Sequence, residues 1–77
     1  MNLVELAIGK SGVIKSVGGQ GELRNRLLDL GLIPRTKVTK IKVAPLGDPM
    51  QLTVRGYELT IRSDDAEKIE IEECGLK

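Results

Sequence analysis

The sequence contains no histidine, phenylalanine or tryptophan, and it has only one tyrosine and one cysteine. Without histidine, the chain lacks the commonest general base and the commonest metal ligand of proteins. The lone cysteine, Cys74, excludes an internal disulfide and any metal site built from several cysteines. It also has no histidine to activate its thiol as a nucleophile. These absences predict a protein that is not an enzyme, holds no cofactor and folds in a reducing compartment.

Long hydrophobic runs are absent as well. No stretch approaches the roughly 18 apolar residues that a membrane-spanning helix needs. The first residues, Met1 to Glu5, include an acid and lack the basic region of a signal peptide. We therefore expect a cytoplasmic protein without direct membrane insertion. Its 77 residues suffice for one domain, 1–77, of which residues 72–77 are expected to form a frayed tail.

One segment has the periodicity of a helix. Leucines at positions 23, 27 and 30 follow the spacing i, i+4, i+7, which predicts a helix over residues 21–30. Gly31 is expected to end this helix in the left-handed conformation, with Leu32 folded back on Leu27. Pro34 prevents any continuation of the helix.

The remaining pattern is that of short strands. Residues 12–17 form a first β-branched run between glycines, and residues 36–44 form a second. In the second run Val38 is out of phase with Thr39, Ile41 and Val43, which predicts a bulge or bend. Residues 45–49 contain the turn-forming residues of a loop.

A hairpin follows this loop. A two-residue turn at Arg55-Gly56 pairs Val54 with Tyr57 and Leu52 with Leu59, so that apolar partners share one face. Ser63 is expected to cap a single helical turn, and Ile69 and Ile71 belong to a last strand. Five short strands with one helix after the first predict a mostly β protein, a small antiparallel barrel. The alternative is an open α+β sheet with the helix on one face.

The charges are divided unevenly along the chain. Residues 1–44 have a net charge of +5 and residues 45–77 a net charge of −4. This asymmetry is capable of steering a charged partner, but two solvated faces are the simpler interpretation. The carboxylates after residue 63 are interpreted as a solvated acidic face rather than a cation site. We expect no nucleic-acid binding, because single-strand binders of this size stack bases on aromatic side chains.

Two apolar residues have no clear role in folding. Leu46 lies at the tip of a loop that also contains Pro45 and Pro49, and Ile33 follows the helix end. An exposed leucine between prolines is suited to contact a partner protein. The alternative, that Leu46 covers an open end of the barrel, stays open at this point.

The order of three motifs resembles the FeoA family. The motifs are Leu23-Arg24-Asn25-Arg26-Leu27-Leu28-Asp29-Leu30-Gly31-Leu32-Ile33-Pro34, Val43-Ala44-Pro45-Leu46-Gly47-Asp48-Pro49 and Val54-Arg55-Gly56-Tyr57-Glu58-Leu59-Thr60-Ile61-Arg62. The resemblance implies an SH3-like barrel of about five strands. One departure concerns Arg35, which stands where the family usually has glycine. Because arginine disfavours a positive φ, we expect a type I turn there.

The resemblance also implies a function. FeoA proteins are small cytosolic accessory proteins of bacterial ferrous iron uptake, which implies a non-enzymatic module that docks on the cytosolic GTP-binding region of the permease FeoB. The alternative is a metal-responsive domain that binds Fe²⁺ or Mn²⁺ directly, similar to the SH3-like domain of diphtheria-toxin-type repressors. An exposed edge strand also allows a homo-oligomer. The candidate partner contacts are Leu32, Ile33, Arg35, Leu46 and Asp48.

Overall fold

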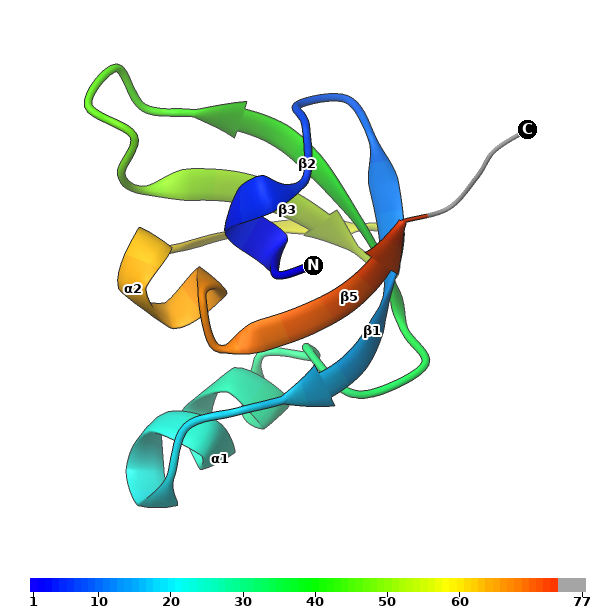
Figure 1. Ribbon diagram of the computed structural model, residues 1–77, viewed down its shortest axis with the longest axis vertical. Coiled ribbons are helices and arrows are strands. Elements are labelled where there is room, and N and C mark those ends of the chain that lie inside the picture. Colours follow the sequence, from blue (N-terminus) through cyan, green and yellow to red (C-terminus); the bar gives the residue numbers. More distant parts are fainter. Residues whose placement is uncertain (74–77) are drawn as a thin grey trace.

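The computed structural model describes residues 1–73 and places five strands in one antiparallel sheet with the order β4-β3-β2-β1-β5 (Figure 1). The chain order is 3-10 helix η1 (Leu3–Glu5), β1 (Ser11–Val17), α1 (Gly21–Asp29), β2 (Lys37–Val43), β3 (Met50–Val54), β4 (Tyr57–Ile61), α2 (Ser63–Ala66) and β5 (Ile69–Glu73). The predicted class, mostly β with a helix after the first strand, is confirmed. Within residues 1–73, no helix is long and apolar enough to cross a membrane.

The β3–β4 hairpin has the predicted register. Val54 lies opposite Tyr57, Leu52 opposite Leu59 and Met50 opposite Ile61. The turn residues Arg55 and Gly56 have φ values of 52° and 87°. Two consecutive positive φ values are those of a type I′ turn, whose twist matches that of the flanking strands. Turn geometry and burial pattern therefore select the same register.

The helix end also has the predicted form. Gly31 has a φ of 99°, and its N–H donates to the carbonyl of Leu28 at 3.0 Å. The N–H of Leu32 donates to the carbonyl of Leu27 at 3.2 Å, which completes a Schellman motif. Leu27 and Leu32 are both fully buried. The chain reversal after α1 therefore places both leucines in the core.

The irregularity in β2 is confirmed, but its predicted position is wrong. Val38 is fully buried and pairs with Val54, so it belongs to the core face. The register shift lies between Lys40 and Lys42, and Ile41 between them is 36% exposed. A bulge changes which face of the sheet the following residues occupy. The in-and-out alternation of Ile41 and Val43 therefore does not extend back to Val38.

This arrangement buries a lysine. Lys40 is only 3% exposed, and its Nζ donates to the carbonyl of Val4 at 2.9 Å. Burial lowers the pKa of the Lys40 ammonium below its ordinary value. The side chain thereby fixes the N-terminal segment against β2, where Leu3 and Leu6 are buried over the sheet.

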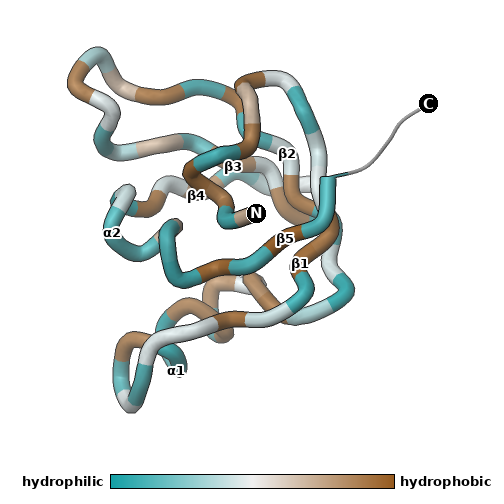
Figure 2. Tube along the Cα trace, viewed as in Figure 1, coloured by the Kyte–Doolittle hydropathy of each residue, from teal (hydrophilic) through white to brown (hydrophobic). Residues whose placement is uncertain are grey.

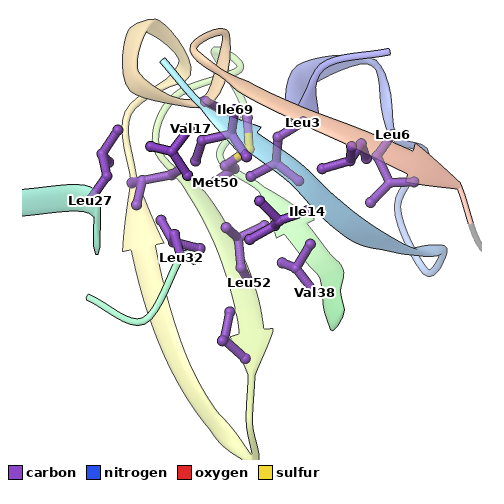
Figure 3. Packing of buried hydrophobic residues seen from close by; sticks show 14 residues of the cluster. Leu3, Leu6, Ile14, Val17, Leu27, Leu32, Val38, Met50, Leu52 and Ile69 are labelled. Carbon is purple, nitrogen blue, oxygen red and sulfur yellow. The ribbon is translucent and has the colours of Figure 1, made fainter. Parts of the chain in front are cut away.

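The core is entirely aliphatic, apart from the sulfur of Met50 (Figure 3). Its buried members come from every strand, from both α-helices and from the N-terminal segment: Leu3, Leu6, Ile14, Val17, Leu27, Leu32, Val38, Met50, Leu52, Val54, Ile61, Ala66, Ile69 and Ile71. The frayed tail predicted for residues 72–77 is wrong at its start, because Glu72 and Glu73 pair with Val13 and Gly12 of β1. Residues 74–77, including Cys74, lie outside the described part of the chain.

Candidate functional site

The loop that joins β2 to β3, residues 44–49, has a defined conformation. The N–H of Ala44 donates to the carbonyl of Pro49 at 3.0 Å, which closes the base of the loop. The N–H of Gly47 donates to the carbonyl of Ala44 at 2.7 Å and forms a tight turn. Gly47 has a φ of 87°, a conformation that side chains disfavour. We call this segment the β2–β3 loop.

A second set of contacts ties the β2–β3 loop to α2. The Asp48 carboxylate accepts a hydrogen bond from the N–H of Ser63 at 2.8 Å. The Ser63 hydroxyl in turn donates to the carbonyl of Gly47 at 2.7 Å. The expectation that Ser63 caps a helical turn is therefore wrong. Arg62 occupies the N-cap position of α2, and the Ser63 hydroxyl is engaged by the loop. Asp48 fixes the loop to the body of the protein.

Leu46 projects from this fixed loop into solvent. Its side chain is 96% exposed, the largest value among the exposed large hydrophobic residues of the described chain. Figure 2 shows a hydrophobic segment at the far end of the same loop, at the upper left of the view. The interpretation that Leu46 covers an open end of the barrel is therefore wrong, because the side chain contacts almost nothing in its own chain.

A cleft of about 330 Å³ lies at the base of the loop. Its apolar lining comes from Val43, Ala44, Pro45 and Pro49, and Lys42 contributes a cation. An exposed leucine beside a shallow apolar cleft is an arrangement that a partner protein is able to cover. The sequence had indicated the loop but not this cleft, because Gln51 of β3 and Thr60 of β4 also line it.

The other three predicted contact residues do not join this surface. Leu32 is fully buried, so it is a core residue and its assignment as a partner contact is wrong. Ile33 is half-buried and Arg35 is exposed, and both precede β2, whereas the β2–β3 loop follows it. A seven-residue strand spans about 20 Å. Ile33 and Arg35 thus lie at the opposite end of β2 from Leu46 and Asp48. The segments that precede and follow β2 leave the strand at its two ends (Figure 1).

The expected type I turn at Arg35 is also wrong. The N–H of Thr36 donates to the carbonyl of Ile33 at 3.2 Å, and Arg35 at the third position has a φ of 72°. These values are those of a type II turn. The N–H of Arg35 also donates to the carbonyl of Ile14 at 2.7 Å. This contact with β1 stabilises a conformation that arginine alone disfavours.

The described residues contain no obvious centre for metal chemistry. Among residues 1–73, no three histidine, cysteine, aspartate or glutamate side chains lie close enough together to hold a metal ion. The ion pairs found there join the N-terminal ammonium to Glu70 and Arg26 to Asp65, both at the surface.

The amino-acid sequence is similar to those of known proteins. The sequence model of the FeoA domain matches residues 1–73. The chain belongs to the FeoA family. FeoA proteins are associated with ferrous iron transport, and a relative from Porphyromonas gingivalis is an Fe(2+) transport protein A/Fe(2+) transporter FeoB fusion protein. The present FeoA chain is 39% identical to it over 72 residues, which cover 94% of this chain but only 8% of the fusion protein.

Solved structures of FeoA proteins have the same architecture. FeoA from Chlorobium tepidum is 37% identical, with a TM-score of 0.90 over 97% of this chain and 71% of that chain. FeoA from Stenotrophomonas maltophilia, solved in complex with zinc and described as an SH3 domain protein, is 25% identical. Its TM-score is 0.82, over 94% of this chain and 89% of that chain. The predicted SH3-like barrel is thereby confirmed.

Proposed function

We propose that this FeoA chain is a cytoplasmic, non-enzymatic accessory module of ferrous iron uptake that docks on the cytosolic GTP-binding region of a FeoB permease. The fusion protein of P. gingivalis supports this proposal, because its name joins an FeoA part and a FeoB part in one polypeptide. Two modules that are fused in one relative are expected to act next to each other when they are separate chains. The absence of histidine from the sequence fits a binding role rather than catalysis.

The β2–β3 loop is the proposed contact. Burial of the almost fully exposed Leu46 side chain contributes about 1.5–3 kcal/mol to binding. The hydrogen bonds from Ala44, Gly47 and Ser63 fix the loop before the partner arrives. A preorganised loop loses little conformational entropy on binding, so most of this free energy is retained. Asp48 acts as a positioning residue because its carboxylate is engaged by Ser63.

The test is a binding titration with the purified cytosolic domain of the cognate FeoB. We expect Leu46→Asp to weaken binding by about 10- to 150-fold, the factor that corresponds to the lost burial. Ile8→Asp is the matched control, because Ile8 is 58% exposed and lies outside the loop. Arg35→Gly tests the opposite end of β2 and is expected to leave this binding unchanged. Unchanged binding of Leu46→Asp would refute the proposed contact.

Metal binding is the second candidate, because the S. maltophilia relative is described as a zinc complex. We rank it lower, since the part of the chain that the structure describes brings no three suitable donors together. Isothermal titration of the protein with Fe²⁺ and Mn²⁺ tests this candidate directly, and stoichiometric micromolar binding would favour it. Edge-strand pairing through β4 stays a prediction, which size-exclusion chromatography tests, whereas the outer edge of β5 already pairs with Met1 and Asn2.

A further inference from the structure

A second surface depression lies at the opposite end of β2 from the β2–β3 loop. This groove has a volume of about 470 Å³. Apart from Gly56, its lining residues are cationic or hydroxyl-bearing: Arg35, Thr36, Lys37, Thr39, Thr53 and Arg55. We call it the arginine groove. No carboxylate lines it, although acids make up 11 of the 77 residues of the chain.

The sheet register brings these side chains to one face. Thr39 of β2 lies directly opposite Thr53 of β3. Side chains two residues apart in a strand point to the same face, so Lys37 lies on the face of Thr39. Arg55 is the first residue of the turn after β3 and lines the same groove. Lys37 and Arg55 therefore lie beside the paired Thr39 and Thr53, at the end of the β2–β3 strand pair where β2 begins and β3 ends. The turn before β2 adds Arg35 to this end.

Both arginines adopt a backbone conformation that favours glycine. Arg35 and Arg55, with φ values of 72° and 52°, are the non-glycine residues with positive φ in the structure of residues 1–73. They belong to two separate turns, and both line the same groove. Arginine at a left-handed position costs free energy that glycine would avoid. This conformational cost occurs at two turns that line the same arginine groove, which points to a functional role for the two guanidinium groups.

The three cations of the arginine groove, Arg35, Lys37 and Arg55, form no ion pair among the described residues. Glu58, which lies opposite Thr53, directs its carboxylate to the amide of Gln51 at 2.6 Å. Three exposed positive charges thus lie in one groove beside Thr39 and Thr53.

We infer that the arginine groove binds a phosphate anion, carried by a soluble phosphate ester or pyrophosphate. Guanidinium groups bind phosphate through two parallel hydrogen bonds, and lysine adds a point charge. The Thr53 hydroxyl supplies a further donor to phosphate oxygens, whereas the Thr39 hydroxyl is hydrogen-bonded to that of Ser11 at 2.7 Å. No aromatic ring lines the groove, so the stacking platform of a single-stranded nucleic acid is missing there.

The experiment is a titration of the ¹⁵N-labelled full-length protein with inorganic pyrophosphate at constant ionic strength, followed by NMR. We expect saturable shifts confined to the amides of the groove, chiefly Arg35, Thr36 and Gly56. Arg35→Gly and Arg55→Gly should each weaken this binding at least tenfold. Both variants are expected to fold, because glycine favours their φ values. Lys37→Gln provides an additional test that leaves both turns unchanged.

Arg62→Gly is the matched control. It removes the same side chain and charge, but Arg62 has a φ of −80° and lies outside the groove. We expect its pyrophosphate affinity to equal that of the wild type. Shifts spread over all lysine and arginine positions, or equal weakening by Arg62→Gly, would overturn the proposal. Stronger binding of a glutamate-rich peptide to the same amides would also overturn it in favour of an acidic protein partner.

A second experiment distinguishes a phosphate on a soluble molecule from a phosphate in a lipid headgroup. Sedimentation with phosphatidylglycerol vesicles, compared with phosphatidylcholine vesicles, measures binding to a phosphate in a lipid surface. We expect pyrophosphate to bind and both kinds of vesicle to leave the protein in the supernatant. The assignment to a soluble ligand would be overturned if the wild type bound vesicles but not pyrophosphate, and if Arg55→Gly abolished the vesicle binding. The Leu46→Asp variant should bind pyrophosphate normally, which separates this proposal from docking on FeoB.

Discussion

Replacement of Arg55 by glycine is expected to make the protein more stable. The φ of 52° at Arg55 is of the kind that costs an L-residue about 1–2 kcal/mol. Glycine removes this cost but loses about 0.5–1 kcal/mol through the greater freedom of the unfolded chain. The balance is a gain of about 0.5–1 kcal/mol in the free energy of unfolding. For a domain of this size, that gain raises Tm by about 2–8 °C. The same reasoning applies to Arg35, whose φ is 72°.

Urea denaturation of the wild type and the variants measures this gain. Arg62→Gly is again the control, because Arg62 has a φ of −80°. Glycine relieves no left-handed strain at Arg62, and the freedom it adds to the unfolded chain offsets its preference for the helix N-cap, so we expect little change in stability. The wild type also places Arg55 close to two other cations of the arginine groove. Measurement at low and high salt separates relief of this repulsion from relief of backbone strain, since only repulsion is screened.

The difference in stability change between Arg55→Gly and Arg62→Gly tests the reasoning from φ. If Arg55→Gly and Arg62→Gly destabilised the protein equally, the left-handed conformation would not set the stability of the hairpin turn. If the gain at Arg55 vanished at high salt, charge repulsion would account for it. Either result would refute the reasoning from φ. A gain in stability for Arg55→Gly that persists at high salt, with little change for Arg62→Gly, is the expected outcome.

Three further substitutions test the fold. Leu32→Ala should cost about 2–5 kcal/mol in urea denaturation, because Leu32 is fully buried. Ser63→Ala removes the hydrogen bond to Gly47 and should cost about 1 kcal/mol, with faster hydrogen exchange in the β2–β3 loop. Lys40 has a lowered pKa in the folded protein, so the unfolded state binds more protons. Stability should therefore rise relative to Lys40→Met as pH increases from the lowered pKa toward about 10.4. A wild-type and variant difference that is flat with pH would contradict the burial of the amine.

Local signals explain most of what the sequence predicted correctly. In the β3–β4 hairpin, the spacing of apolar residues and a two-residue turn select one register, and both lie within twelve residues. The end of α1 is equally local, because Gly31 and Leu32 complete hydrogen bonds with the helix that precedes them. In such segments the preferred backbone conformation and the tertiary structure agree, so sequence reasoning suffices.

The incorrect predictions depend on contacts between distant segments. Arg35 adopts a positive φ because its N–H meets the carbonyl of Ile14 across the sheet. Lys40 is buried because the N-terminal segment supplies the carbonyl of Val4. Ser63 serves the β2–β3 loop rather than a helix end. The sequence identified Leu46 as a candidate contact, but only the three-dimensional arrangement shows that Arg35 lies in a different surface region.

The β2–β3 ribbon separates an apolar end, with Leu46, from a cationic end, with Arg55. A protein that covers the apolar end leaves the cationic end accessible, so the geometry permits a ternary complex in which two ligands are held at once. Any influence of one ligand on the affinity of the other would have to pass through the paired strands between them. By thermodynamic linkage, that influence would be equal in both directions. A domain of 77 residues is thus large enough to act as an adaptor as well as a docking module.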